Sequence, residues 1–214
     1  MSPSLNTTAD GSLYFTVEDI AKWDEALEAG KFLSHAGYEQ MWSPVKLNNG
    51  NTAPYGFGWR VAKTDSGHRM LEHGGAWQGF ASYIARYPDD RLTVAVLCNR
   101  AGANVGYIAK RVAGFYLPAL APRVHSAVKL DPAILSSYAG DYRLEDRLTT
   151  KVSVAGDRLE TTWLGEKIGM IPESEVAFFE ADSDRTFRFV KNNNGNVTAL
   201  VISVPEELTL RRLP

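Results

Sequence analysis

The chain has 214 residues, 44% of them hydrophobic and 22% charged, which is close to the average for soluble globular proteins. Its 23 Lys and Arg residues against 25 Asp and Glu give a net charge of −2, so it lacks the basic surface typical of nucleic-acid-binding proteins. The longest apolar run, residues 92–98, is too short to span a membrane, and the single cysteine excludes an internal disulfide framework.

The first two predicted elements are helices. Thr16 and Asp19 have the spacing of a capping box, apolar residues then recur at helical intervals, and Gly30 supplies a stop. A second, shorter helix is predicted from Ser34 to about Trp42, because serine is a favoured N-cap residue.

Strand signals follow an Asn- and Gly-rich turn at residues 48–51. Four strand candidates cover residues 55–62, 68–73, 79–87 and 92–97. From 104 to 117 the apolar residues have the spacing of an amphipathic helix. This order of helices, strands and a final helix predicts an α+β domain in which helices flank an antiparallel sheet.

A linker and a second domain are predicted after this helix. Residues 118–132 contain three prolines and no helical or strand period. We therefore divide the chain into residues 1–118, a linker at 119–130 and a second domain at 131–214. The second domain starts with a short helix at 132–138. Eight strand-like segments follow, at 140–145, 149–154, 158–163, 167–171, 175–180, 185–191, 196–203 and 207–212.

Eight short strands in about 75 residues indicate a small up-and-down β-barrel or a curled sheet. The interior of such a barrel either fills with side chains or admits one small ligand. Filling is the more frequent arrangement. The aromatic residues that would either fill this interior or line a ligand cavity are Tyr138, Tyr142, Trp163, Phe178, Phe179, Phe187 and Phe189.

The most informative motif lies within residues 71–80. A predicted strand ends in His73, and Gly74 and Gly75 follow it. Glycines beside a strand edge leave backbone amides unobstructed, and a neighbouring histidine can donate a proton or polarise a developing oxyanion. A hairpin turn that needs glycine and happens to follow a histidine explains the same residues.

Several motifs in order resemble the serine β-lactamase-related hydrolases, a family that includes class C β-lactamases, penicillin-binding proteins, D-aminopeptidases and family VIII-type esterases. The similar segments are Asp-Gly-Ser-Leu-Tyr-Phe-Thr-Val-Glu-Asp-Ile-Ala-Lys-Trp at 10–23, Tyr-Gly-Phe-Gly-Trp at 55–59, His-Gly-Gly at 73–75 and Gln-Gly-Phe at 78–80. The resemblance covers about residues 10–118. Residues 130–142 resemble the start of the lipocalin-like barrel domain that some family members carry.

The resemblance implies a hydrolase that acts on an ester or amide bond of a small-molecule substrate and requires no cofactor. His-Gly-Gly corresponds to the family's third active-site element. His73 would act as an electrostatic or general-acid helper, and the backbone of Gly75 and Ala76 would bind the oxyanion. The residues that would contact the substrate are Gly74, Trp77 and Tyr55.

The family's other two elements, a Ser-x-x-Lys on a helix and a Tyr-x-Asn, should both precede residue 10. Ser-x-x-Lys occurs here only at 43–46 and 126–129, and Tyr-x-Asn does not occur. Pro44 biases Ser43 toward an extended backbone, and Ser126 lies in the predicted linker. Neither serine is therefore expected to be the nucleophile, and the chain is similar to the C-terminal portion of such a hydrolase.

Two alternatives stay open. The first is a stand-alone, truncated hydrolase that uses water activated by a divalent metal such as Zn on ester or phosphoester substrates. Its candidate ligands are His68 and His73, although two residues five apart on one strand point to opposite faces unless a bulge intervenes. The second alternative is a non-catalytic domain that binds a ligand or a partner.

The resemblance also bears on partners and location. Without the family's N-terminal strands and helix, the sheet would keep an exposed edge and face, so we expect a homo-oligomer formed through the exposed sheet. We expect no nucleic-acid or membrane partner. Because the N-terminus lacks the features of a secretory signal, the chain as written is expected in the cytoplasm, or in the periplasm or outside the cell if an N-terminal region was removed.

Overall fold

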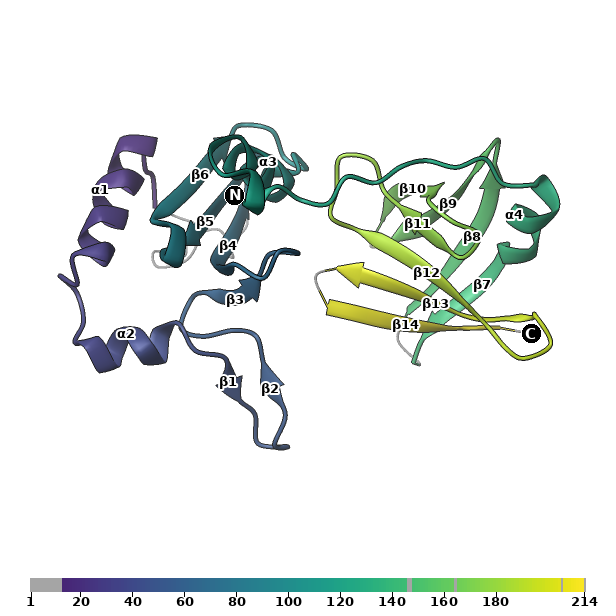
Figure 1. Cartoon of the computed structure of the whole chain (residues 1–214), viewed down its shortest axis with the longest axis horizontal. Helices are drawn as coiled ribbons and strands as arrows, with labels where there is room; N and C mark the ends of the chain where they lie inside the picture. Colours follow the sequence, from purple (N-terminus) through teal and green to yellow (C-terminus); the bar gives the residue numbers. More distant parts are fainter. Residues whose placement is uncertain (1–12, 146–147, 164, 205, 214) are drawn as a thin grey trace. The chain divides into compact units, whose positions relative to one another are not determined.

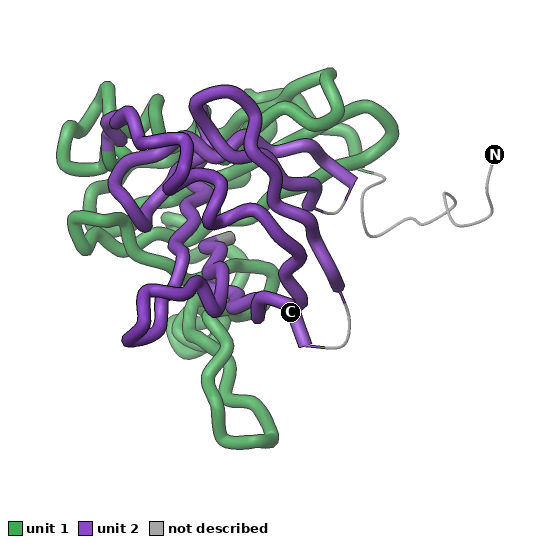
Figure 2. Tube along the Cα trace, turned by 90° about the vertical axis from the view of Figure 1, so that its right-hand side faces the viewer, with its two compact units in different colours: residues 1–123 green, residues 124–214 purple. Residues whose placement is uncertain are grey.

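The computed structural model describes residues 13–145, 148–163, 165–204 and 206–213. The chain divides into two compact units, residues 1–123 and residues 124–214, which are coloured separately in Figure 2. Residues 10–12, with which the first family-like motif begins, lie outside the described residues. No helix among the described residues is long and apolar enough to cross a membrane.

Unit 1 begins with the two predicted helices, α1 (Val17–Glu28) and α2 (His35–Met41). The Thr16 hydroxyl accepts a hydrogen bond from the Asp19 backbone amide, and the Asp19 carboxylate accepts one from the Thr16 amide, each at 3.1 Å. The bond from the Thr16 amide, together with a second bond that the Thr16 hydroxyl donates to the same carboxylate at 2.9 Å, lowers the pKa of the Asp19 carboxyl. Ser34 caps α2 through Gly37. Both predicted helix starts are therefore confirmed.

A four-stranded antiparallel sheet forms the centre of unit 1, in the order β3 (Arg60–Lys63), β4 (Arg69–Trp77), β5 (Phe80–Tyr87) and β6 (Leu92–Cys98) (Figure 1). Helix α3 (Val105–Tyr116) packs on one face. Helices α1 and α2 pack on part of the other. The cluster under α3 comprises Met70, Ala85, Tyr87, Val94, Ala109, Ala113 and Leu120, and the cluster under α1 and α2 comprises Leu27, Tyr38, Trp59 and Leu71.

Short elements complete unit 1. Strands β1 (Val45–Lys46) and β2 (Thr52–Ala53) flank the Asn- and Gly-rich turn. The 3-10 turns are η2 (Pro88–Asp90) and η3 (Pro118–Leu120).

Two strand predictions need correction. The strand expected at 55–62 begins only at Arg60, because residues 55–58 turn and Gly58 has a φ of +74°. The strand expected to end at His73 continues through both glycines to Trp77. The turn lies instead at Gln78 and Gly79, whose φ values are 41° and 97°. Pairing with β5 holds the glycines in extended backbone, which glycine adopts without strain.

Unit 2 is a closed antiparallel barrel of eight strands preceded by helix α4 (Pro132–Tyr138), as the sequence predicted (Figure 1). The strands are β7 (Gly140–Leu144), β8 (Leu148–Ala155), β9 (Arg158–Trp163), β10 (Glu166–Pro172), β11 (Ala177–Phe179), β12 (Thr186–Lys191), β13 (Val197–Val204) and β14 (Glu206–Arg212). The chain is therefore an α+β protein with a partial antiparallel sheet and a β-barrel, the predicted fold class.

Aromatic side chains fill the barrel core. Six of the seven aromatic residues that the sequence placed in the barrel interior belong to one buried cluster, while the seventh, Phe179, stacks on His125. The buried hydroxyl of Tyr142 donates to the Tyr138 backbone oxygen at 2.7 Å, and that of Tyr138 donates to the Glu175 oxygen at 2.7 Å. Burial raises the pKa of Tyr142 to about 12. The interior is thus a packed core with satisfied polar groups.

Candidate active site

A histidine and a tyrosine meet on the open part of the sheet in unit 1. The Tyr55 hydroxyl and His73 Nε2 lie 2.8 Å apart, and their rings have an edge-to-face arrangement with centroids 6.0 Å apart. Tyr55 is 40% exposed and His73 is also exposed, so both reach solvent. When the neutral imidazole carries its proton on Nδ1, the hydroxyl donates to Nε2. The pair can therefore pass a proton to or from a bound molecule.

A tight turn holds Tyr55 in this position. A Cβ atom added at Gly56 would lie 2.1 Å from the Met41 backbone oxygen, so only glycine fits there. The Gly56 amide donates to the Trp59 oxygen at 2.7 Å, and Tyr55 forms an isolated antiparallel bridge with Arg60 at the start of β3. The Tyr-Gly-Phe-Gly-Trp motif thus acts as a support for the tyrosine.

The hairpin that joins β4 to β5 determines which backbone groups are available. Positive φ at both turn residues is the type I′ pattern, in which the flanking pair, here Trp77 and Phe80, exchanges both hydrogen bonds. Along an antiparallel ladder, hydrogen-bonded and non-hydrogen-bonded pairs alternate. The amide of Gly75 therefore points toward β5, and those of Gly74 and Ala76 point away from it.

On that side, β3 pairs with β4 only from Arg69 to Glu72. The N–H and C=O groups of Gly74 and Ala76 consequently face an edge that no described strand occupies. The N–H groups among them can donate to a carbonyl oxygen of a bound molecule, and the open edge lies on the same side as the strand to which Tyr55 is bridged. Of the two predicted oxyanion donors, Ala76 has the suitable direction and Gly75 does not.

Gly75 has a different structural role. It shares a face with His73 and Trp77 and is exposed, so a stretch of bare backbone separates those two side chains. Its φ lies outside the left-handed region, and the one close neighbour of an added Cβ would be the Ser82 hydroxyl oxygen, at 2.6 Å. The backbone conformation does not require glycine there. What glycine supplies is an unobstructed surface.

A buried ionic cluster supports β4 from the opposite face. The Glu72 side chain is 2% exposed and contacts Arg60 and the Tyr83 hydroxyl, with Lys110 Nζ at 3.8 Å. The Tyr83 ring also packs against Gly74, where an added Cβ would lie 3.5 Å away. Because a buried carboxylate with these partners holds its position, the strand that carries His73 is anchored directly behind the site.

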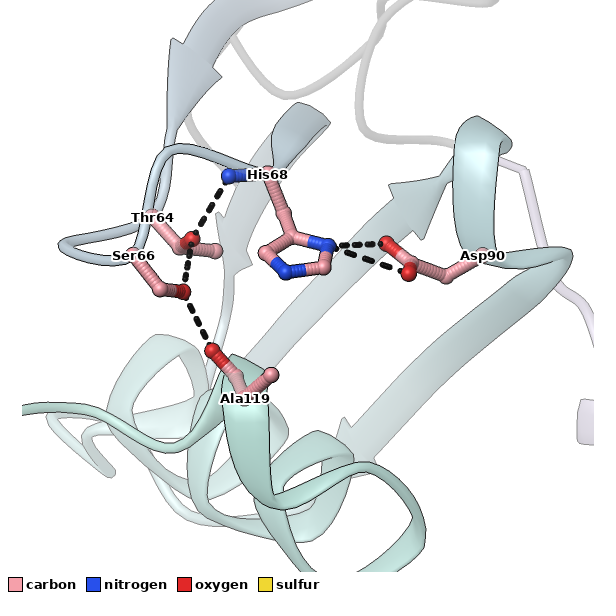
Figure 3. Close-up of polar contacts among 5 residues, drawn as sticks. All are labelled: Thr64, Ser66, His68, Asp90 and Ala119. Atoms are coloured by element: carbon pink, nitrogen blue, oxygen red, sulfur yellow. Dashed lines mark hydrogen bonds and ion pairs between the residues drawn. The ribbon is translucent and has the colours of Figure 1, made fainter.

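His68 does not join His73. It precedes β4, and its Nδ1 lies 2.9 and 3.0 Å from the two carboxylate oxygens of Asp90 (Figure 3). In the same view the Ser66 hydroxyl donates to the Ala119 oxygen and contacts the Thr64 hydroxyl. Among the described residues, no group of three or more His, Cys, Asp or Glu side chains is arranged to hold a metal ion. The two histidines proposed as ligands thus have separate partners.

Both Ser-x-x-Lys serines lie off helices. Ser43 follows α2, and its hydroxyl donates to the Glu39 backbone oxygen at 2.6 Å, while Lys46 ends the short strand β1. Ser126 lies in a segment without regular structure. As the sequence predicted, neither serine lies on one helix face together with its lysine.

Comparison with known proteins identifies two matches along the chain. Residues 2–115 match the family model described as Beta-lactamase. Residues 124–213 match the model described as Domain of unknown function (DUF3471).

Two curated relatives are longer proteins. The chain is 33% identical over 178 residues to Penicillin-binding protein 4* of Bacillus subtilis (strain 168), an alignment that covers 79% of this chain and 40% of the relative. It is 30% identical over 104 residues to the D-aminopeptidase of Gluconobacter oxydans (strain 621H), with 47% of this chain and 20% of the relative covered. The chain therefore spans less than half the length of these relatives.

The fold is also found in a solved structure. This structure is the octameric penicillin-binding protein homologue from Pyrococcus abyssi, with a TM-score of 0.50 and 21% sequence identity. The match covers 96% of this chain and 48% of that one.

Proposed function

Because the chain belongs to the Beta-lactamase family, we propose that it is the carbonyl-binding and proton-transfer part of a hydrolase that acts on ester or amide bonds. The observation that carries the proposal is the 2.8 Å contact between Tyr55 and His73 beside the open edge of β4. A proton-transfer pair and unpaired amides at one edge are the two components that acyl transfer needs besides a nucleophile.

In the proposed reaction each residue has a role. The scissile carbonyl oxygen accepts a hydrogen bond from the Ala76 amide, and the bare backbone at Gly75 leaves room for the acyl group. When an O–H group attacks the carbonyl carbon, its proton passes to the Tyr55–His73 pair. The pair then returns a proton to the leaving oxygen or nitrogen as that bond breaks. Trp77 borders the acyl group on the side away from His73.

When this chain acts by itself, we assign water as the attacking nucleophile. In a serine hydrolase of the family that the sequence resembles, a serine hydroxyl would replace it. The relatives Penicillin-binding protein 4* and D-aminopeptidase support an amide or ester substrate, since their names describe binding of a β-lactam and cleavage of an amino-terminal peptide bond. The chain covers only 40% and 20% of them.

Hydrolysis of p-nitrophenyl acetate by the purified chain tests this proposal. We expect His73→Gln to lower the rate by about 100-fold, the lower end of what a positioned general acid or base contributes. His35→Gln is the matched control, because the His35 side chain is 90% exposed and lies on α2 in the same unit. Equal rates for His73→Gln and His35→Gln would refute the proposal. A parent protein that hydrolyses the ester no faster than His73→Gln does would also refute it.

A further inference from the structure

The buried carboxylate of Glu72 lies at the point where β3 stops pairing with β4. Glu72 is the last residue of β4 that pairs with β3, opposite Arg60, and among the described strands residues 73–77 pair with β5 alone. Ala85, directly across from Glu72 on β5, belongs to the cluster under α3, so the Glu72 side chain lies on that face. His73 follows in the strand and therefore points to the opposite face. Glu72 thus stands behind the candidate active site, out of reach of a bound molecule.

The same carboxylate is connected to both members of the Tyr55–His73 pair. His73 is the next residue of β4, so its backbone follows that of Glu72. On the neighbouring strand, Glu72 contacts the Arg60 guanidinium, and the Arg60 backbone forms the bridge to Tyr55. An ion pair between directly opposite residues holds two strands in register. This ion pair therefore lies between the residue that carries the imidazole and the residue that carries the hydroxyl.

Tyr83 and Lys110 hold the carboxylate from two further elements. Tyr83 lies opposite Gly74 and diagonal to Glu72, and its hydroxyl donates to the carboxylate. The ring fills the space between the sheet and α3, since an added Cβ would lie 3.5 Å from it at Gly74 and 3.1 Å from it at Gly106. The Lys110 amino group of α3 lies 3.8 Å from the carboxylate. Contacts from β3, β5 and α3 leave the Glu72 side chain little freedom.

Stability alone is a poor account of these buried charges. Removing a carboxylate from water is costly, and apolar side chains of similar volume often stabilise a fold as well or better. An apolar residue at position 72 would fill the space, but it would make no directional contact with Arg60. The directional contact occurs where two strand ends must keep a 2.8 Å separation between the Tyr55 hydroxyl and His73 Nε2.

We propose that Glu72 is a positioning residue of the candidate active site, whose carboxylate ties β3 to β4 so that the Tyr55 hydroxyl meets His73 Nε2 at hydrogen-bond distance. The inference rests on the proposed function and adds to it a residue that touches neither the substrate nor the transferred proton. A displacement of about 1 Å in such a contact can lower a rate by about 100-fold, whereas folding tolerates it.

Glu72→Gln tests the assignment by kinetics. The variant keeps the shape of the side chain and removes the charge that Arg60 contacts. We expect kcat for p-nitrophenyl acetate to fall by about 10- to 100-fold with KM nearly unchanged, because the contact serves proton transfer and not binding. Asp24→Asn is the matched control, since it removes a carboxylate that contacts Arg86, an arginine whose side chain is 3% exposed in the same unit. The control should leave kcat unchanged.

The ¹⁵N signal of His73 Nε2 reports the contact without any turnover. Tyr55→Phe removes the hydroxyl that donates to this nitrogen, so it should shift the signal in the parent protein and in Asp24→Asn. In Glu72→Gln the same substitution should cause no shift, because the contact is already lost. If Glu72 only stabilised the fold, Glu72→Gln would lower the urea midpoint and leave the Tyr55-dependent shift intact, which would overturn the assignment.

Tyr83→Phe provides a second test in case Glu72→Gln does not fold. It keeps the ring between Gly74 and Gly106 and removes the hydroxyl that donates to the carboxylate. We expect kcat to fall by about 3- to 10-fold, the effect of one hydrogen bond, and the Tyr55-dependent ¹⁵N shift to decrease. A parent-like kcat and a parent-like shift in each variant that folds would contradict the positioning role.

Failure of the positioning role is distinguishable from failure of the proposed function. If Glu72→Gln abolishes the Tyr55-dependent shift but hydrolysis does not depend on His73, the proposed function alone is refuted. If hydrolysis depends on His73 but Glu72→Gln keeps the parent's kcat and the parent's shift, the positioning role alone is refuted.

Discussion

Replacing Tyr142 by phenylalanine tests whether the barrel interior is the packed core that its contacts indicate. At neutral pH the variant loses the hydrogen bond to the Tyr138 oxygen, whose length is 2.7 Å. It leaves that buried oxygen without this donor, and the expected cost is about 1–1.5 kcal/mol of unfolding free energy.

The size of this difference falls as pH rises, because burial raises the pKa of Tyr142 from 10.0 to about 12. A group with a raised pKa in the folded state contributes its stability fully below the unfolded value, and this stability is lost as pH rises toward the folded value. From the two pKa values, the parent protein loses about 1.4 kcal/mol by pH 11 through this one residue. The phenylalanine variant has no such loss.

The two proteins should therefore differ by about 1–1.5 kcal/mol at pH 8 and be nearly equal in stability at pH 11. Trp163 is the sole tryptophan among residues 124–214 and is buried in the barrel core, so its fluorine signal in protein labelled with 5-fluorotryptophan reports barrel unfolding in urea. Tyr116→Phe, at a tyrosine 75% exposed on α3, is the control. A difference that stays constant from pH 8 to pH 11 would refute the assignment of Tyr142 to a dry core.

Three further predictions concern unit 1. Gly56→Ala should destabilise unit 1 by about 1–3 kcal/mol, because the new methyl group would meet the Met41 oxygen, and urea unfolding of unit 1 tryptophans measures this; a stability equal to that of the parent would show that the turn relaxes freely. Ester hydrolysis should be unchanged after treatment with EDTA, since the roles assigned to Tyr55 and His73 involve no metal; loss of turnover that added Zn²⁺ restores would favour the metal alternative. The outer edge of β6 has no partner among the described strands, so light scattering should report a dimer or larger homo-oligomer, and a monodisperse monomer would count against pairing through this edge.

The sequence was most informative where structure depends on near neighbours. The capping box of Thr16 and Asp19 forms as expected, and the period-two pattern of the C-terminal part locates all eight barrel strands. These features depend on residues a few positions apart, or on one face of one strand. Two glycines in succession predicted a break in β4, and pairing with β5 overrode that local preference.

The candidate site depends on long-range register, which is harder to predict. Tyr55 and His73 are 18 residues apart, and they meet because the Gly56 turn and the β3–β4 pairing bring them together. The resemblance suggested Tyr55, whereas no motif showed that the amide of Ala76, and not that of Gly75, points to the open edge of β4. The signal that could have shown it is the Gln78–Gly79 turn, since placing the turn there fixes which residues of β4 direct their amides toward β5.

A double-mutant cycle on the hydrolysis of p-nitrophenyl acetate tests the central claim most directly, namely that Tyr55 and His73 act as one proton-transfer pair. We expect Tyr55→Phe to lower kcat/KM in the parent protein and to have no further effect in His73→Gln, because residues that act as a unit are not additive. Losses that add, or a Tyr55→Phe variant as active as the parent, would contradict the account.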